Sequence, residues 1–392
     1  MPNLSSDQIF FFAGEPSGDL HGSYLLKALK KQSSSLEFFG VGGPLMRKEG
    51  IQTILPMEKF QVMGFTDVLC ALPSLCQSFF HVRNAILTSK PKAVVLIDYP
   101  GFNLRLAASL RKKSYTGKII QYISPTVWAW DKKRIYTMAR SLDGLLTIYP
   151  FEPACYKETS LSVRYIGNPL KEYIDQYAYD PHWSKNLGIP ADTNLIALFP
   201  GSRIGEVLRN FYLQLKAVER LHQEDPSIYA AVSCASDAIA ETIRKMAAQS
   251  SLQEGKNLFL IPLKYTYELM KGCRTAVAKS GTVTLELALH KKPTVVVYKL
   301  TKLNRLIAAY LLKLNMPYYC IVNILRGKQV FPELMELGLS EDNVYRYLKA
   351  LHTPGTARDR CEAGCEEVCK IIGLPEASSH AAHALMQHLE IE

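Results

Sequence analysis

The chain has 392 residues, of which 48% are hydrophobic, so it is long enough for two domains and apolar enough to build a core in each. This composition excludes disorder for most of the chain. The formal net charge is +10, but Lys and Arg form no block of five or six residues. That disfavours a nucleic-acid footprint and leaves an anionic membrane surface or a phosphorylated substrate as the partner.

The nine Cys residues form no CxxC pair and have no His at a metal-ligand spacing, which argues against a metal site. The first apolar run, residues 9–13, is too short for a signal peptide. No run of 18 apolar residues occurs, so no membrane span is expected. These features predict a cytoplasmic protein with reduced thiols, which could still lie against a membrane.

Short apolar runs alternate with helical patterns, which is typical of parallel sheets with crossover helices. The first half contains predicted strands at residues 9–13, 38–41, 93–97, 118–123 and 145–149. The second half contains predicted strands at residues 195–199, 230–234, 258–262, 275–278 and 294–298. Runs this apolar indicate strands that are covered on both faces. The predicted fold class is therefore α/β, with two Rossmann-like domains in series.

A change of composition near Pro169, followed by a polar stretch that ends near Pro181, predicts the domain junction. We expect an N-terminal domain at 1–168 and a C-terminal domain at 169–352. Residues 353–392 contain two predicted helices without a following strand, so they must pack back on one of the domains. Two open sheets of this kind place a ligand crevice outside the carboxyl ends of their strands, between the domains.

The chain lacks the motifs that are expected of several enzyme classes. The glycines that follow the first two predicted strands do not have the GxGxxG spacing of a dinucleotide site. The chain also contains no GxxxxGK[ST] loop and no DxD pair for a metal under a nucleotide diphosphate. An NAD enzyme or an ATPase is therefore a minor alternative, and no cofactor is expected.

The strongest local signal follows the strand that ends at Ala278. Ser280 and Gly281 form a small-residue turn, and a helix begins near Thr282. The N–H groups and dipole of that helix would accept a diphosphate without a metal. Glu286 lies one turn further, where a carboxylate can take both hydroxyls of a ribose. The alternative is a helix cap followed by a solvated Glu.

A second anion-binding turn is predicted at Gly201-Ser202-Arg203, directly after the first strand of the second domain. The small residues permit close backbone approach, and the Arg203 guanidinium can meet an anionic oxygen with a fork of donors. The alternative is that Ser202 caps the helix over 204–221 and that Arg203 is a surface charge.

Asp98 stands at the carboxyl end of the predicted strand 93–97, at the edge of the sheet where ligands bind. A carboxylate there could take a proton from an acceptor hydroxyl as a general base. The alternative is that Asp98 caps the following helix.

Six pieces of sequence, in this order, resemble the lipid-A-disaccharide synthase family over nearly the whole chain. They are residues 13–19, 62–65, 97–103, 123–130 and 200–203, and Asn323 within 322–325. The resemblance implies the two-domain glycosyltransferase type B fold and an inverting hexosyltransferase of lipid A biosynthesis in a Gram-negative bacterium. It further implies transfer of 2,3-diacylglucosamine from UDP-2,3-diacylglucosamine to 2,3-diacylglucosamine 1-phosphate, giving the β-1,6 disaccharide 1-phosphate and UDP. The reaction would be independent of metal.

The resemblance also assigns residues by position. By position, Asp98 becomes the candidate base, and Glu15, Arg203 and Asn323 become active-site residues. Together with Ser17 and Asp19 of the first piece, the candidate acceptor and active-site residues are Glu15, Ser17, Asp19 and Asn323. The two anion-binding turns and the helix after the second supply the candidate donor residues Ser202, Arg203, Ser280, Gly281, Thr282 and Glu286. The chain departs from the family pattern at Asp131, where an Arg is usual, and at Gly101, where an acidic residue is usual. A phosphate contact at Asp131 would have to come instead from Lys132, Lys133 or Arg134.

Residues 68–82 contain no Asp, Glu, Lys or Arg, and their large apolar residues include Leu69, Leu72, Leu75, Phe79 and Phe80. Because the implied substrates carry acyl chains, this stretch is a candidate membrane contact on the cytoplasmic face of the inner membrane. The alternative is a core helix interrupted by Pro73. A second candidate is the apolar stretch 306–314, flanked by Lys299, Lys302, Arg305 and Lys313.

Two other functions remain open at this point. A UDP-sugar epimerase of the same architecture would need no lipid-binding patch, whereas a peripheral membrane-binding protein would need no anion-binding turns. Family members include dimers that exchange C-terminal segments, so a homodimer is compatible with the helical tail.

Overall fold

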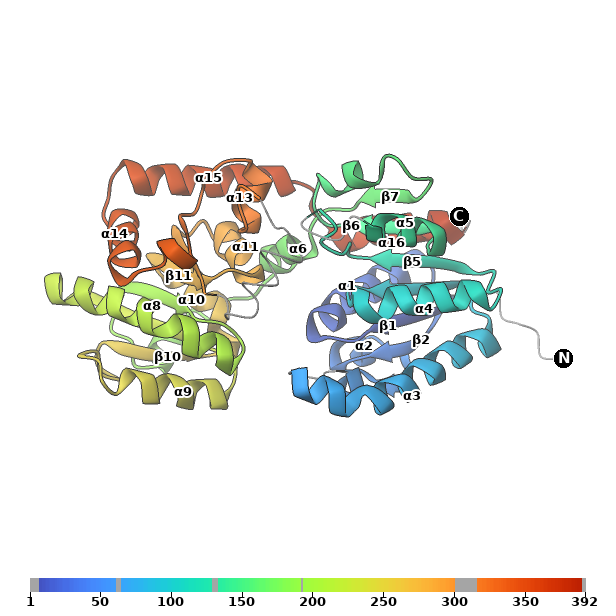
Figure 1. Ribbon diagram of the computed structural model, residues 1–392, viewed down its shortest axis with the longest axis horizontal. Coiled ribbons are helices and arrows are strands. Elements are labelled where there is room, and N and C mark those ends of the chain that lie inside the picture. The colour runs from blue at the N-terminus through green and yellow to red at the C-terminus, as the bar shows by residue number, and fades with distance from the viewer. Residues whose placement is uncertain (1–6, 61–64, 129–132, 192, 300–315, 390–392) are drawn as a thin grey trace. The chain divides into compact units, whose positions relative to one another are not determined.

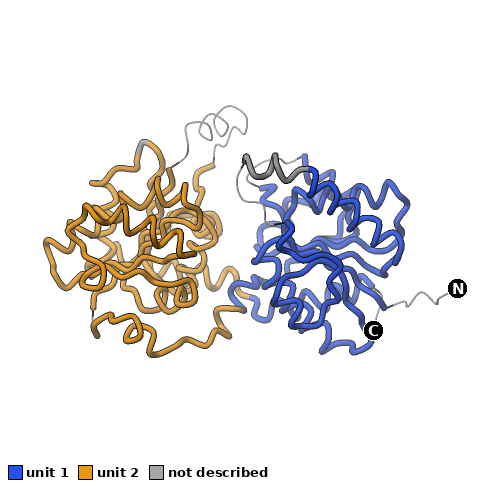
Figure 2. Tube along the Cα trace, turned by 90° about the horizontal axis from the view of Figure 1, so that it is seen from below, with its two compact units in different colours: residues 1–172, 374–392 blue, residues 173–373 orange. Residues whose placement is uncertain are grey.

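The computed structural model describes residues 7–60, 65–128, 133–191, 193–299 and 316–389, apart from the side chains of residues 65–72 and 337. The chain divides into two compact units (Figure 2). Unit 1 consists of Met1–Glu172 and Leu374–Glu392, and unit 2 is Tyr173–Gly373. The C-terminal segment, which we expected to pack as a whole on one domain, is divided between the two units.

Among the described residues, seven parallel strands form the sheet of unit 1, in the order β3-β2-β1-β4-β5-β6-β7. Their bounds are β1 Gln8–Ala13, β2 Glu37–Gly42, β3 Gln52–Pro56, β4 Ala93–Ile97, β5 Lys118–Tyr122, β6 Gly144–Thr147 and β7 Ser162–Tyr165. Every residue of β4 is buried, which explains the continuous apolar run in its sequence.

Helices cover both faces of this sheet (Figure 1). They are α1 Pro16–Gln32, α2 Pro44–Lys48, α3 Phe65–Ser89, α4 Pro100–Lys112, α5 Lys133–Ser141 and α16 Ala377–Leu389, while α6 Pro169–Asp175 crosses into unit 2. Ile9 and Phe11 of β1 pack with α1 and α16, whereas Phe10 and Phe12 pack with α3, α4 and α5. The alternation of side chains along one strand therefore supplies two separate cores.

Unit 2 repeats this architecture. In the part of it that the structure describes, six parallel strands have the order β10-β9-β8-β11-β12-β13. Their bounds are β8 Asn194–Phe199, β9 Ile228–Cys234, β10 Leu258–Pro262, β11 Thr275–Lys279, β12 Thr294–Tyr298 and β13 Glu333–Met335. Its helices are α7 Trp183–Asn186, α8 Ile204–Glu224, α9 Asp237–Ala247, α10 Thr266–Gly272, α11 Thr282–Leu289, α13 Ile321–Arg326, α14 Glu341–His352 and α15 Thr356–Ile372.

Each sheet has one point where the strand order reverses. In unit 1 the chain runs outward from β1 through β2 to β3 and then returns to β4 on the other side of β1. In unit 2 it runs from β8 through β9 to β10 and returns to β11. Open α/β sheets bind ligands outside the carboxyl ends of the strands at such a reversal. Ligands are therefore expected at the carboxyl ends of β1 and β4 in unit 1, and of β8 and β11 in unit 2.

Candidate active site

A pocket of about 410 Å³ lies at the strand reversal of unit 2. Its lining comes from the segments that follow β8, β9, β10 and β11, and β8 pairs directly with β11. The lining residues are Phe199, Gly201, Ser202, Arg203, Glu206, Ser233, Ala235, Leu263, Thr266, Lys279, Ser280, Gly281, Thr282, Val283 and Glu286. All six residues that the sequence assigned to the donor therefore line one pocket.

The turn after β8 is shaped by Gly201, whose φ is +129°. A Cβ at this position would lie 2.6 Å from the side chain of Glu206, so only glycine fits. Ser202 and Arg203 are exposed at the start of α8. The helix-cap alternative does not hold for Ser202, because the N-cap residue of α8 is Arg203.

The turn after β11 leads into α11, whose N-cap is Gly281. Thr282 and Val283, the first residues of this helix, line the pocket, so the positive end of the helix dipole lies at its wall. Glu286 lines the same pocket, and the Tyr267 hydroxyl donates a hydrogen bond of 2.8 Å to its Oε1. Burial raises the pKa of Glu286, while the Tyr267 hydrogen bond lowers it. The solvated-Glu alternative is therefore wrong.

Two charged residues of the pocket were missing from the residues that the sequence predicted. Lys279 is the last residue of β11, and its Nζ lies 3.1 Å from Oε1 of Glu206 in the first turn of α8. Both side chains line the pocket and are mostly buried, with 19% and 15% exposed. Lys279 could have been found from its position directly before Ser280, but its pairing with Glu206 has no local signal in the sequence.

In unit 1, Ala13 at the end of β1 pairs with Ile97 at the end of β4, so the residues that follow them are neighbours at the strand reversal. Glu15 and Ser17 are exposed after β1, at the start of α1. Glu15 is close enough to the ring of Tyr99 that its charge contributes to raising the pKa of that phenol. The structure therefore brings Glu15 and the Asp98-Tyr99 turn together.

Asp98 and Tyr99 both have left-handed backbone conformations, with φ of +48° and +42°. Non-glycine residues rarely adopt this region, and such strain is typical of functional sites. The Asp98 carbonyl accepts hydrogen bonds from Asn103 Nδ2 at 2.7 Å and Gln121 Nε2 at 2.9 Å, and both of these side chains are fully buried. The Asp98 N–H donates to the Tyr122 carbonyl at 2.9 Å. The backbone of Asp98 is thus fixed from three directions.

The carboxyl group of Asp98 does not cap α4, because the N-cap residue of that helix is Tyr99 and no side chain caps it. Desolvation by burial raises the pKa of Asp98, and a hydrogen bond with the Tyr99 backbone offsets part of that effect. A carboxyl group with a raised pKa, held at the end of a central strand, is suited to accept a proton.

Two residues assigned to the acceptor and active site are instead buried and fully engaged. Asp19, which is 2% exposed, accepts hydrogen bonds of 2.9 Å from the backbone N–H groups of Gly43, Leu45 and Met46 at the start of α2. A Cβ on Gly43 would lie 2.5 Å from this carboxylate. Asp19 is therefore a helix cap that joins α1 to α2, and direct contact with a substrate is not supported.

Asn323 is likewise fully buried. Its Nδ2 donates to the Phe331 carbonyl and to Glu333 Oε1, and its Oδ1 accepts from the backbone N–H groups of Val330 and Phe331. This amide fixes the loop before β13, so the structure supports a structural role for its side chain and does not support direct contact with a substrate.

The candidate membrane residues divide into groups. The side chains of Leu69 and Leu72 lie outside the described residues, and so does the stretch 306–314 with Lys302, Arg305 and Lys313. Residues 62–64 and 129–132, which are not membrane candidates, also lie outside them. Leu75 and Phe79 are partly buried against the core, and the Phe79 ring lies 5.4 Å from Phe102. Phe80 is 51% exposed. The core-helix alternative therefore fits Leu75 and Phe79 but not Phe80.

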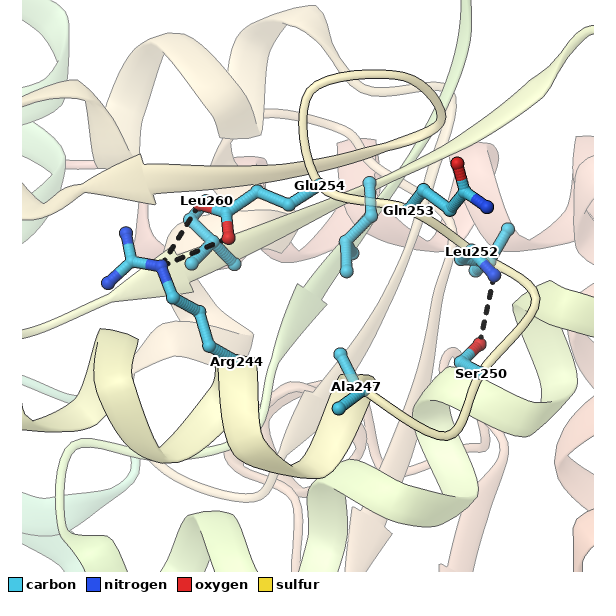
Figure 3. Close-up of a pocket in the computed structure, with 9 residues that line it drawn as sticks. Arg244, Ala247, Ser250, Leu252, Gln253, Glu254 and Leu260 are labelled. Atoms are coloured by element: carbon cyan, nitrogen blue, oxygen red, sulfur yellow. Dashed lines mark hydrogen bonds and ion pairs between the residues drawn. The ribbon is translucent and has the colours of Figure 1, made fainter.

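A second pocket of unit 2 lies between α9 and β10 (Figure 3). Its volume is about 310 Å³, and an ion pair of 3.0 Å between Arg244 Nε and Glu254 Oε2 stands at one side. Among the described residues, no group of three or more His, Cys, Asp or Glu could hold a metal ion. No helix in the same part of the chain is long and apolar enough to cross a bilayer.

The family model described as lipid-A-disaccharide synthetase matches residues 9–380. A lipid-A-disaccharide synthase of Chlamydia pneumoniae is 36% identical over 375 residues, covering 94% of this chain and 61% of that protein. One of Geobacter sulfurreducens is 31% identical over 390 residues, covering 99% of each. The chain thus spans about three fifths of the length of the chlamydial relatives that it matches.

Two solved structures show the same architecture at low sequence identity. The S. aureus MnaA–UDP co-structure has a TM-score of 0.68 at 15% identity and covers 99% of this chain and 98% of that one. Trehalose-6-phosphate synthase OtsA has a TM-score of 0.59 at 10% identity and covers 98% and 99%. Identities this low establish the fold alone. The predicted fold of two Rossmann-like domains of the glycosyltransferase type B is confirmed.

Proposed function

The chain belongs to the lipid-A-disaccharide synthetase family, and from that membership we propose that it is an inverting glycosyltransferase with that activity. It transfers 2,3-diacylglucosamine from UDP-2,3-diacylglucosamine to 2,3-diacylglucosamine 1-phosphate. The products are the β-1,6 disaccharide 1-phosphate and UDP. The observation that carries the proposal is the pocket of unit 2, where two anion-binding turns and Glu286 line a single cavity.

Unit 2 takes the donor in this proposal. The α11 N-terminus and Arg203 receive the diphosphate, and Glu286 receives the ribose hydroxyls. Unit 1 takes the acceptor, with Asp98 as the base and with Glu15 and Ser17 beside it. The acceptor oxygen forms a bond to the anomeric carbon as the bond from that carbon to the diphosphate breaks. The hydroxyl proton goes to Asp98, and UDP leaves with the electron pair.

An assay of UDP release tests the proposal. With UDP-2,3-diacylglucosamine as donor, UDP should appear only when 2,3-diacylglucosamine 1-phosphate is also present. Release of UDP without acceptor, or interconversion of the donor sugar, would instead favour an epimerase. The likeness to MnaA does not by itself favour that alternative, because it extends to the fold alone. A protein that binds vesicles but releases no UDP under any of these conditions would be a membrane-binding protein without this activity.

We expect activity to survive EDTA. The donor pocket offers Arg203, Lys279 and a helix N-terminus as positive groups, whereas its carboxylates are Glu206, which is paired with Lys279, and Glu286, which is bonded to Tyr267. UDP release should proceed at the same rate in EDTA and in added Mg²⁺. Loss of turnover in EDTA and its recovery with divalent metal would contradict this prediction.

We also propose that the protein lies on the cytoplasmic face of the inner membrane, where acyl chains can remain in the bilayer. Burial of one methylene is worth about 0.8 kcal/mol, so full extraction of a long acyl chain would be costly. Phe80 supports a contact from α3, and Arg83 lies 4.9 Å from its ring. We propose in addition that the protein can form a homodimer, as the resemblance to the family implies.

Variants of two neighbouring rings of α3, Phe80 and Phe79, can distinguish a role in membrane contact from a role in folding. Phe80→Ser should weaken binding to anionic vesicles and lower the melting temperature less than Phe79→Ser does, because the Phe80 side chain is 51% exposed. Phe79→Ser should lower the melting temperature, because that ring packs on Phe102. Co-sedimentation with vesicles and a thermal melt of each variant give the two readouts. Unchanged vesicle binding by the Phe80 variant would remove Phe80 from the membrane contact.

A further inference from the structure

The donor pocket contains an anion that belongs to the chain itself, the carboxylate of Glu206. Its Oε1 lies 3.1 Å from Lys279 Nζ, and its Oε2 accepts a hydrogen bond of 3.2 Å from the Ser202 backbone N–H. One carboxylate thus connects the turn after β8 with the end of β11. These two partners, a backbone N–H at a helix start and an ammonium group, are also the groups that bind phosphate oxygens in proteins.

We propose that Glu206 is an internal competitor for the diphosphate of the donor, and that Lys279 is a diphosphate-binding residue. When no nucleotide is bound, Glu206 neutralises Lys279 and takes the Ser202 N–H. The diphosphate displaces the carboxylate from both groups, and the carboxylate returns to them as UDP leaves. This inference rests on the proposed function, because it assigns the same pocket to a nucleotide diphosphate.

The surroundings of Lys279 support such an exchange. The pair is largely desolvated, and burial of two charges offsets much of their attraction, so the pair itself adds little to stability. An unpaired ammonium at this depth would be unfavourable, which means that one anion or another should accompany it. Tyr298 lies on Lys279 as well, with the ring centroid 5.2 Å from Nζ. That contact can hold the ammonium in place while its anionic partner changes.

A role for Glu206 in the helix alone does not account for the geometry. A carboxylate in the first turn of α8 is favoured by the helix dipole and by the Ser202 N–H. That role requires no cation on a different strand. The contact with Lys279 adds an ion pair between the first turn of α8 and the end of β11, and Gly201 leaves space for the Glu206 side chain, since any Cβ there would collide with it.

Binding of UDP and of uridine, measured by calorimetry, tests the proposal. Glu206→Gln keeps an oxygen for the Ser202 N–H but removes the competing charge, so UDP affinity should rise about three- to tenfold. Dissociation of UDP in stopped flow should slow by a similar factor. Lys279→Met should lower UDP affinity about tenfold or more, because a charged contact to phosphate is lost. Neither change should alter the affinity for uridine, which has no phosphate.

The second pocket provides a matched control. Glu254 pairs with Arg244 at 3.0 Å in the same unit (Figure 3), in a pocket that has no lining residue in common with the donor pocket. Glu254→Gln removes the same kind of charge and should leave UDP affinity unchanged. An equal rise in this variant would mean that UDP responds only to the overall charge of the unit, and this would overturn the proposal.

The remaining outcomes separate this inference from the proposed function. If the unaltered protein does not bind UDP, the proposed function fails. If it does bind UDP but Glu206→Gln binds equally or more weakly, Glu206 positions Lys279 and does not compete with the ligand. Unchanged affinity in Lys279→Met would exclude Lys279 from the site. If Glu206→Gln does not fold, Glu206→Asp takes its place, because it moves the carboxylate away from Lys279 by the length of one methylene. A failure of Glu206→Asp to raise UDP affinity would overturn the proposal.

Discussion

Replacement of Asp98 by Asn should lower kcat at least a hundredfold. A positioned general base contributes about 10²–10⁴-fold, and Asn is nearly the same size but cannot take the proton. UDP affinity should remain close to that of the unaltered protein, because the donor pocket belongs to unit 2. Steady-state kinetics and calorimetry provide the two measurements. A fall of less than tenfold would move the base to another group, with Glu15 as the next candidate.

The stability of this variant provides the control. Burial raises the pKa of Asp98, so the folded state binds that proton more tightly than the unfolded state does. The charged carboxylate therefore disfavours folding increasingly as the pH rises through the raised pKa. At neutral pH, the melting temperature of Asp98→Asn should accordingly be no lower than that of the unaltered protein. In the unaltered protein, kcat should fall as the pH is lowered through the same pKa, because the proposed base must be unprotonated.

Replacement of Glu286 by Ala should weaken UDP binding by about 1–3 kcal/mol, the range for hydrogen bonds that involve a charged group. In the proposal the carboxylate receives the ribose hydroxyls, so uridine should lose affinity together with UDP. This pattern distinguishes Glu286 from Lys279, whose loss should affect UDP only. Calorimetry with both ligands checks the prediction, and unchanged affinity for both would exclude Glu286 from the donor site.

Tyr267→Phe separates the ligand contact of Glu286 from its internal hydrogen bond. It removes the 2.8 Å bond to Oε1 but keeps the carboxylate in the pocket. Because that bond lowers the pKa of Glu286, its loss should move the pKa further up. Because the carboxylate itself remains in the pocket, UDP affinity of this variant should change less than that of Glu286→Ala at neutral pH. A larger loss in Tyr267→Phe would show that the phenol is the more important group.

The central strands could be predicted from the sequence because both of their faces are buried. β4, for example, has five buried residues and reads as one apolar run. Strands β3, β7 and β13 were not predicted. They lie at sheet edges, and β3 and β7 contain only exposed or half-buried residues, as in β7, where Ser162 and Arg164 are exposed. Strand β13 has only three residues, of which one, Leu334, is buried. A four-residue edge strand with this pattern cannot be distinguished from a loop by composition.

The site was predictable where its parts are local in sequence. The turns at Ser202 and Ser280 follow central strands, so their positions on the sheet follow from the topology. The pairing of Glu206 with Lys279 joins two turns and depends on which strands are neighbours. For Asn323 the motif could be recognised in the sequence, but its hydrogen-bond partners, Val330 and Phe331, could not, because they lie in a later loop. Similarity to a family locates such a residue without revealing whether it touches a ligand.

Helix α16 belongs to the core of unit 1, although all of unit 2 precedes it in the chain. Its residues Ala381 and Leu385 are fully buried in the cluster that contains Ile9 and Phe11 of β1. During translation, the N-terminal part of unit 1 must therefore wait for the ribosome to add residues 173–373. At about 5–20 residues per second, this delay is on the order of 10–40 s.

The usual order, in which the N-terminal domain folds first, should accordingly be reversed. Unit 2 is continuous in sequence and can reach its native state while one face of the unit 1 sheet still lacks its last helix. Throughout that interval, strand residues that α16 covers in the folded unit, such as Ile9 and Phe11, should remain accessible. Chaperone engagement in the cell should therefore concentrate on the first 172 residues, and it should end only after α16 has left the exit tunnel.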